Sequence, residues 1–212
     1  MYTTDFCTTR RGNYWWDSTS KWNLSVTSAP AAEPVTVDDI KAHSRVDLAD
    51  EDGWIRDAIS AARRLCETFT KRAFVTQTLR LSLDQMPAWE FYLPRPPLVS
   101  VTTIKYQDSS NVQQTISGSA YTVDTYSEPG RITPAYNTSW PTGIVHTNAI
   151  EVIYVAGYGA ASAVPASIKQ AIKMTVESWY QERGTQVIDQ TVAELPMSAK
   201  SLLRAESWGY LP

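Results

Sequence analysis

Residues 51–84 read EDGWIRDAISAARRLCETFTKRAFVTQTLRLSLD, and the spacing of their apolar side chains changes partway through. Over residues 51–70 the apolar side chains recur every three or four positions, which is the period of a helix with one buried face. Further on, Leu79, Leu81 and Leu83 alternate with polar residues, which is the period of a half-buried strand. The chain therefore passes from a helix into a β region within a few residues.

Patterns of the same two kinds extend in both directions. A short helix is expected near 36–46, where Thr36 is a candidate N-cap and Asp38 and Asp39 suit the positive end of the helix dipole. A second apolar stripe predicts a helix near 165–184. The other expected elements are a short helix near 196–205 and strands near 90–93, 99–106, 112–116, 120–124, 130–133 and 149–155.

This order of elements predicts an α+β fold, a small helical bundle with an inserted antiparallel β-unit. The helices on the two sides of the insertion must meet, because two helices cannot bury their apolar stripes alone. The expected division is an N-terminal arm (1–34), a helical core (35–75 and 160–184), an inserted β-unit (76–159) and a C-terminal docking tail (185–212).

A stiff segment, YLPRPPLVS at 92–100, interrupts the β region. Pro94, Pro96 and Pro97 lack backbone donors and have a fixed φ, so a central strand cannot contain them. The segment is interpreted as a rigid connection before the strand VTTIKY. It is either a plain stiff loop or a ridge on which another protein docks.

The N-terminal region carries large aromatic side chains without a helical period. Tyr14, Trp15, Trp16 and Trp22 would be costly to leave in water, and such groups mark contact surfaces. Two interpretations stay open: an arm that docks on another subunit, or a strand that packs on its own domain.

Composition restricts the class of protein. A hydrophobic content of 43% and a charged content of 19% suit a soluble globular chain, and a net charge of −3 argues against a surface that coats DNA. The N-terminus lacks a secretory signal, and no apolar run reaches the roughly 18 residues of a membrane helix. Cys7 and Cys66 are too few for a disulfide framework, which favours folding in the cytoplasm.

Residues with catalytic or metal-binding chemistry are sparse. His43 and His146 have no partner at zinc-ligand spacing, and Cys66 lies on an apolar helix face. The acidic loop DLADEDG lacks the terminal Glu of a calcium loop, and Gly157 and Gly159 fit a backbone turn better than a phosphate loop. We therefore expect no catalytic, cofactor or metal site.

Five aromatic side chains could instead stack on sugars or bases, but they lack interleaved Lys and Arg. A carbohydrate-binding module is the weakest of the alternatives considered. The aromatic residues in question are Trp89, Phe91, Tyr92, Trp140 and Tyr158.

One combination of motifs resembles a known family. The stretch VTVDDIKAHSRVDLADEDGWIRDAISAARRLCETFTKRAFVTQTLRLSLD is followed by LPRPPLVSVTTIKY, YTVD, PGRITPAY, SWP, AGYG and VPASIKQAIKMTVESWYQERG. In this order, over about 36–184, it resembles the head–tail connector (adaptor) family of tailed bacteriophages, prophages and gene transfer agents.

The resemblance implies a non-enzymatic virion protein. Such proteins form a ring, typically of twelve copies, beneath the portal; the ring extends the DNA channel and offers a surface to a stopper or tail-side neck protein. Packaged DNA would pass through without sequence-specific binding, no membrane would be involved, and assembly would take place in the host cytoplasm. Another neck or tail-completion component is the alternative.

By analogy with the family, the C-terminal tail is expected to contact the portal. The residues assigned to this contact are Leu195, Met197, Leu202, Leu203, Trp208, Tyr210 and Leu211. The residues assigned to subunit or neck contacts are Tyr14, Trp15, Trp16, Trp22, Pro94, Pro96 and Pro97.

Overall fold

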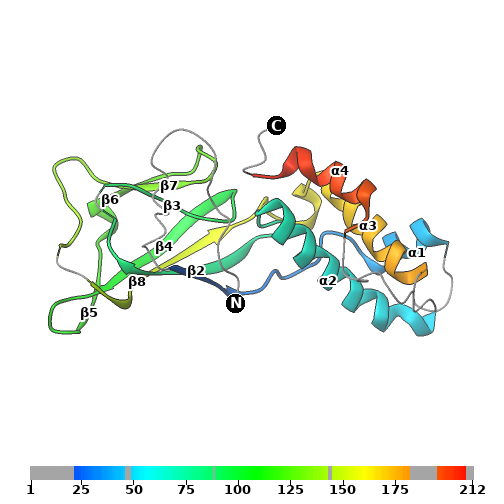
Figure 1. Cartoon of the computed structure of the whole chain (residues 1–212), viewed down its shortest axis with the longest axis horizontal. Helices are drawn as coiled ribbons and strands as arrows, with labels where there is room; N and C mark the ends of the chain where they lie inside the picture. The colour runs from blue at the N-terminus through cyan, green and yellow to red at the C-terminus, as the bar shows by residue number, and fades with distance from the viewer. Residues whose placement is uncertain (1–21, 46–48, 88, 143–144, 182–194, 209–212) are drawn as a thin grey trace. The chain divides into compact units, whose positions relative to one another are not determined.

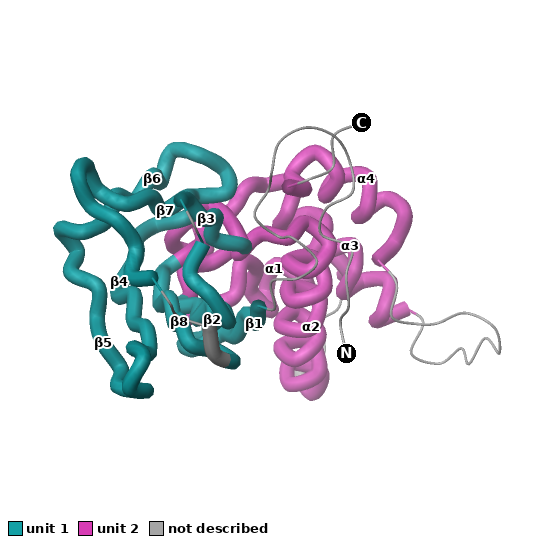
Figure 2. Tube along the Cα trace, turned by 60° about the vertical axis from the view of Figure 1, so that its left-hand side comes forward, with its two compact units in different colours: residues 1–29, 78–94, 98–155 teal, residues 30–77, 95–97, 156–212 magenta. Residues whose placement is uncertain are grey.

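The computed structural model of the chain describes residues 22–45, 49–87, 89–142, 145–181 and 195–208. Contacts divide it into two compact units (Figure 2). The β unit contains the described residues of 22–29, 78–94 and 98–155, and the helical unit contains those of 30–77, 95–97 and 156–208. The α+β class is confirmed, and each unit is treated separately below.

The helical unit is built from four α-helices (Figure 1). They are α1 (Val37–Ser44), α2 (Asp52–Thr70), α3 (Ala166–Gln181) and α4 (Met197–Glu206). All four were expected within a few residues of these bounds. Single turns of 3-10 helix lie at Ala49–Glu51 and Ala161–Ala163.

The predicted N-cap of α1 is confirmed. The Thr36 hydroxyl accepts a hydrogen bond from the Asp39 backbone N–H at 3.1 Å, and the Asp39 carboxylate accepts one from the Thr36 N–H at 2.8 Å. This reciprocal pair satisfies two donors that a helix start leaves open. Because Thr36 donates to its carboxylate, the pKa of Asp39 lies below its ordinary value.

The core of the helical unit includes α4. Ala199 and Leu203 of α4 are fully buried, together with Ile55 and Ala62 of α2 and Ile172 of α3. The Trp208 backbone N–H also donates to the Thr70 carbonyl at 3.0 Å. The expected division assigned residues 185–212 to a separate docking tail, whereas the described part of that tail packs within the helical unit.

The β unit contains two sheets. The main sheet has the order β1-β2-β8-β4-β5, and the small sheet has the order β3-β7-β6. The strands of the main sheet are β1 (Trp22–Ser28), β2 (Gln77–Gln85), β4 (Leu98–Gln107), β5 (Gln113–Thr115) and β8 (Val145–Ala156); those of the small sheet are β3 (Phe91–Tyr92), β6 (Tyr121–Asp124) and β7 (Arg131–Pro134). A 3-10 turn, Gly118–Ala120, precedes β6. The seven strands after residue 76 were all expected from the sequence.

Strand β1 shows that part of the N-terminal region is a strand. It pairs antiparallel with β2, with Trp22 opposite Leu83 and Leu24 opposite Leu81. Residues 22–28 are therefore a strand of their own β unit, as one of the two interpretations held. Tyr14, Trp15 and Trp16 lie outside the described residues.

The core of the β unit is close-packed where β7 begins. Gly130 has no room for a side chain, because a Cβ there would lie 2.4 Å from Cδ2 of Leu98. The Phe91 and Trp140 rings lie 5.7 Å apart, and the Trp140 indole N–H donates to the Trp89 carbonyl at 2.6 Å. Position 130 therefore requires glycine for space rather than for its backbone angles.

We predict that two leucine-sized positions of α4 differ sharply in their contribution to stability. Leu203→Ala should lower the free energy of unfolding by about 2–5 kcal/mol, because it opens a cavity in the helical core. Met197→Ala, on the same helix but 73% exposed, should change it by less than about 0.5 kcal/mol. Denaturant unfolding followed by circular dichroism measures both, and equal effects would contradict the packing of α4.

Candidate interaction surfaces

The residues with reactive side chains have structural roles where the structure describes them. Burial raises the pKa of the Cys66 thiol to about 12, so the thiolate nucleophile is scarce at neutral pH. His43 Nε2 lies 3.1 Å from a Glu177 carboxylate oxygen, which links α1 to α3. His146 lies in β8. Among the described residues, no group of three His, Cys, Asp or Glu could hold a metal ion.

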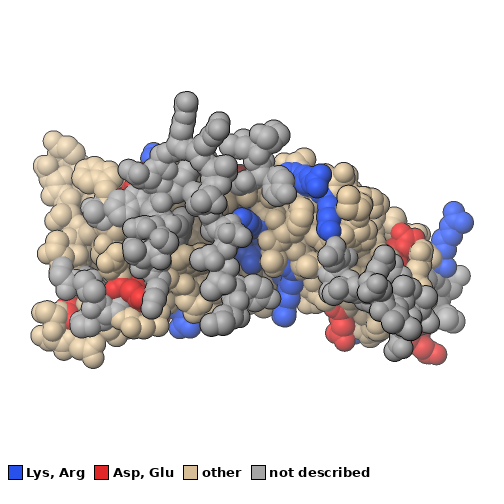
Figure 3. Space-filling model, in the orientation of Figure 1, with Lys and Arg blue, Asp and Glu red and all other residues tan. Residues whose placement is uncertain are grey.

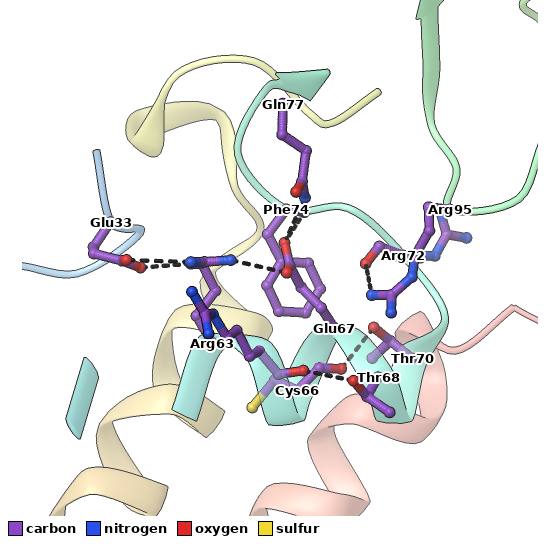
Figure 4. A network of polar contacts seen from close by, with 11 residues as sticks. Glu33, Arg63, Cys66, Glu67, Thr68, Thr70, Arg72, Phe74, Gln77 and Arg95 are labelled. Atoms are coloured by element: carbon purple, nitrogen blue, oxygen red, sulfur yellow. Dashed lines mark hydrogen bonds and ion pairs between the residues drawn. The ribbon is translucent and has the colours of Figure 1, made fainter. Parts of the chain in front are cut away.

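A buried ion pair lies on α2 (Figure 4). Arg63 donates to the Glu67 carboxylate at 2.9 Å and to the Glu33 carboxylate at 2.7 Å. Burial lowers the pKa of Arg63, but the hydrogen bond and charges from Glu33 and Glu67 outweigh it, so the pKa lies above its ordinary value. Arg63 and Glu67 do not belong to the apolar pattern of residues 51–70, yet both are buried.

Glu67 also holds the segment that follows α2. Its second carboxylate oxygen accepts the Phe74 backbone N–H and the Gln77 amide, each at 3.0 Å (Figure 4). The carboxylate is therefore satisfied on both oxygens, as a buried charge requires. Arg63 and Glu67 together bind Glu33 before α1 and residues 74–77 after α2.

Backbone hydrogen bonds connect further segments at which the chain enters or leaves the helical unit. Residues 73–76 bond to 96 through Ala73 N–H and the Pro96 carbonyl at 3.1 Å. They bond to 158–159 through the Phe74 carbonyl and Tyr158 N–H at 2.9 Å, and through Thr76 N–H and the Gly159 carbonyl at 3.0 Å. Residues 73–76, 96 and 158–159 are therefore joined by backbone hydrogen bonds, next to the Arg63–Glu67 pair.

The contacts of these segments explain why the turn at 157–159 contains glycine. Gly157 N–H donates to the Pro97 carbonyl at 2.9 Å, and its φ of +132° is unfavourable for residues with a side chain. A Cβ on Gly157 would lie 2.7 Å from backbone atoms of Val75 and Thr76. The interpretation of Gly157 and Gly159 as a backbone turn is confirmed, since Gly159 also has a positive φ.

The proline segment contributes carbonyl oxygens rather than a fully exposed ridge. Pro96 is buried, while Pro94 and Pro97 are half-buried. The carbonyls of Pro96 and Pro97 accept the hydrogen bonds described above, and the Pro94 carbonyl accepts the Tyr154 hydroxyl at 2.6 Å. The assignment of these prolines to a subunit or neck contact stays a prediction, and Pro96 has little surface left for it.

The residues assigned to the portal contact fall into three groups. Leu195 and Leu203 are buried by the chain itself. Met197 is 73% exposed at the start of α4, and Leu202 and Trp208 are half-buried. Tyr210 and Leu211 lie outside the described residues. The structure thus leaves Met197, Leu202 and Trp208 with surface that a partner could cover.

Other exposed aromatic side chains lie outside the contacts assigned above, although Trp89 was a candidate for stacking on sugars or bases. Trp89, Tyr126 and Tyr136 of the β unit are exposed in loops, and Tyr126 is 98% exposed. Turn-forming clusters such as SEPG at 127–130 signal that their neighbours lie at loop tips. A turn-forming cluster in the sequence indicates a nearby loop tip, but it does not distinguish an exposed tyrosine from a buried one.

Three charged side chains in and next to the small sheet are linked to one another. Arg131 donates to the Asp124 carboxylate at 2.9 Å and to the Glu90 carboxylate at 3.3 Å. Hydrogen bonds from Ser127, supported by Tyr126 and Arg131, lower the pKa of Asp124 to about 2. The stabilisation from this carboxylate is present above its unfolded pKa near 3.8 and is lost as the pH falls toward 2.

No single-sign charged area dominates the view in Figure 3, where Lys, Arg, Asp and Glu are scattered among uncharged residues. Over the described residues of the β unit there are three basic side chains (Arg80, Lys105, Arg131) and six acidic ones (Asp84, Glu90, Asp108, Asp124, Glu128, Glu151), a balance of −3.

None of the helices in the described ranges is long and apolar enough to cross a membrane.

We predict that two adjacent arginines of α2 differ in importance. Arg63→Met should destabilise the chain by about 3–5 kcal/mol, because it leaves two carboxylates without their buried cation. Arg64→Met, at an exposed position, should change stability by less than about 0.5 kcal/mol. Urea unfolding of both variants is the measurement, and an Arg63→Met variant as stable as Arg64→Met would refute the proposed importance of the pair.

Three comparisons place this fold among known proteins. Residues 33–192 match a family model described as head completion protein. A comparison with curated proteins found no match. Among solved structures, similar chains occur in gene transfer agent (GTA) particles, and their identity of about one fifth shows a shared fold.

The structural matches cover almost the whole of both chains. A chain in the neck of an empty GTA particle, computed with C6 symmetry, matches with a TM-score of 0.70 and 20% identity over 90% of this chain and 97% of that chain. A chain in the virion of a native GTA particle gives 0.70 and 21% over 89% and 97%. A chain in the neck of a native GTA particle, computed with C12 symmetry, gives 0.63 and 21% over 90% and 97%. Since the family model spans most of the sequence, this chain belongs to the head completion protein family.

Proposed function

We propose that this protein is a non-enzymatic structural component of a particle neck, where copies form a ring beneath the portal. The ring joins the capsid to the tail and extends the DNA channel. The observation that carries the proposal is the match over 97% of a chain from a neck computed with C12 symmetry, together with membership of the head completion family. We propose twelve copies, a number compatible with both the C12 and the C6 symmetry of the matched necks.

The described chemistry agrees with a structural role. The buried Cys66 thiol is scarcely ionised at neutral pH, and His43 Nε2 lies 3.1 Å from a Glu177 carboxylate oxygen. A ring subunit needs two different faces toward its neighbours and further faces toward its axial partners. The proposed axial partners are the portal on one side and a stopper or tail-side neck protein on the other.

The net charge suits a channel that DNA must pass through. At −3 for the whole chain, the subunit does not favour tight binding of phosphates, which would slow the passage of DNA. We propose that DNA passes without sequence-specific contacts. Assembly would take place in the host cytoplasm, with the finished protein in the virion.

The portal contact is proposed for the exposed side of α4 and the residues that follow it. Met197, Leu202 and Trp208 retain accessible apolar surface, and Tyr210 and Leu211 extend the same segment. Leu195 and Leu203 are buried, so their role would be to hold α4 in place. Residues 1–21, with Tyr14, Trp15 and Trp16, remain proposed contacts with a neighbouring subunit or neck protein.

We predict that Met197→Glu weakens binding to purified portal at least tenfold while the melting temperature stays unchanged. The exposed side chain contributes little to the fold, but a carboxylate buried in an apolar contact is costly. Binding is measured by surface plasmon resonance on immobilised portal. Met197→Leu is the matched control and should bind like the wild type.

Deletion of residues 195–212 would not test the portal contact separately from folding, because it also removes residues of α4 that are buried in the helical core. If Met197→Glu binds as tightly as Met197→Leu, the portal contact lies elsewhere. If the wild-type chain neither binds portal nor appears as a ring at the vertex in electron micrographs, the proposed function itself is wrong.

A further inference from the structure

The main sheet ends in two unlike edge strands. Within the described part of the chain, β1 and β5 each have a neighbour on one side only, since the order is β1-β2-β8-β4-β5. An edge strand presents unpaired backbone N–H and C=O groups that can pair with another chain. Natural proteins protect such edges with charges, prolines or bulges, so the sequence of each edge is informative.

Strand β1 is poorly protected. Its sequence, WNLSVTS over 22–28, contains no charge, no proline and no glycine. The one irregularity in its pairing with β2 falls between Val26 and Ser28, which leaves the five residues 22–26 in regular register. A regular, uncharged edge of this length is a template for a further strand.

Strand β5 offers a matching edge on the other side. Gln114 lies opposite Tyr106, the Val112 carbonyl accepts Asp108 N–H at 3.0 Å, and Ile116 N–H donates to the Ile104 carbonyl at 2.9 Å. Because alternate residues of an antiparallel strand point their backbone groups to one side, Gln113 and Thr115 point theirs away from β4. The stretch 112–116, VQQTI, is also five residues long and uncharged.

Each edge also leaves a valine in water. Val26 is 56% exposed and Val112 is 52% exposed. Val26 lies opposite Leu79, so it shares the face of the buried leucines of β2. Val112 lies two residues before Gln114, which is opposite Tyr106. It therefore shares the face of Tyr106 and of the buried Ile104. Each valine therefore lies on the side of its neighbouring strand that carries buried apolar residues, where a strand added at that edge would cover it.

We propose that β1 of one copy pairs with β5 of the next copy, so that the main sheets form a continuous sheet around the ring. This inference rests on the proposed ring function. A head-to-tail ring needs two different surfaces that fit each other, and two opposite edges of one twisted sheet meet that need. Closure of the ring leaves no free edge, as closure does in a barrel.

A second copy is the occupant because the two edges match one another. Both are short and uncharged, with five residues of β1 and three of β5 in regular register, and each has a half-exposed valine in or next to it. The contact is short, and its few hydrogen bonds alone would give a weak dimer. Occupancy of every edge in a closed ring on the portal would make the association strong.

The test places one charge on each edge. Asn23→Lys on β1 and Gln113→Lys on β5 both change exposed side chains, so the fold should persist, as thermal unfolding verifies. Each variant should reduce the number of copies bound per purified, DNA-filled head at least tenfold, measured by quantitative gel analysis of sedimented heads. Thr125→Lys, which adds the same charge in an exposed turn away from both edges, is the matched control and should bind like the wild type.

A mixture of the two variants tests the head-to-tail arrangement. Asn23→Lys retains an intact β5 edge and Gln113→Lys retains an intact β1 edge, so together they can form one contact and no more. Chemical cross-linking on heads should give dimers from the mixture and a ladder of longer species from the wild type. Either variant binding as fully as Thr125→Lys, or a mixture that gives no dimers, would overturn the proposal.

The two hypotheses fail in different ways. If the wild type and both edge variants all occupy the heads fully, the ring function stands and the edge pairing is wrong. If the wild type itself does not bind heads, the proposed function fails before the edges are tested.

Discussion

The buried ion pair between Arg63 and Glu67 organises the helical unit. A charge removed from water is tolerated only when its partners satisfy it, and here Glu33, the Phe74 N–H and the Gln77 amide complete the set. These partners come from both sides of the helices α1 and α2. The pair therefore fixes where the chain enters the helical unit and where it leaves α2 for the β unit.

The same region explains the composition of the connecting segments. The carbonyls of Pro96 and Pro97 accept backbone hydrogen bonds from Ala73 and Gly157. Glycine at 157 permits a close approach of backbones that a Cβ would prevent. These segments are thus hydrogen-bonded parts of the helical unit.

Element type and position could be predicted well from the sequence. The apolar period of three to four over 51–70 and the alternation from Leu79 to Leu83 depend on local geometry, and both became the elements expected. Helix α1 could be placed for the same reason, because Thr36 and Asp39 form a cap within four residues. Such features require no knowledge of distant parts of the chain.

The contacts between distant segments could not be predicted in this way. The apolar period over 51–70 gives no sign that Arg63 is buried, because the partner Glu33 lies 30 residues away in the sequence. Leu195 and Leu203 were assigned to a partner protein, but they are buried within the helical unit, whose α2 precedes them by more than a hundred residues. A short apolar helix near the C-terminus has the same pattern whether it packs on its own chain or on another, so composition alone cannot decide.

The two ends of the chain therefore differ from the simplest view of docking arms. Residues 22–28 belong to a sheet, and α4 belongs to a helical core, so both segments are ordered parts of the fold. Among the described residues, the contact surfaces proposed above are exposed side chains on one helix and the edges of one sheet. A surface that is already ordered lowers the entropy that an association must overcome.

The position of Cys66 has a consequence for the durability of the folded chain. Its sulfur is fully enclosed on α2, and its high pKa keeps it in the thiol form that oxidants attack slowly. A protein that folds in a reducing cell and later persists in air would retain this residue unmodified. Protection of this one thiol from oxidation thus follows from its burial.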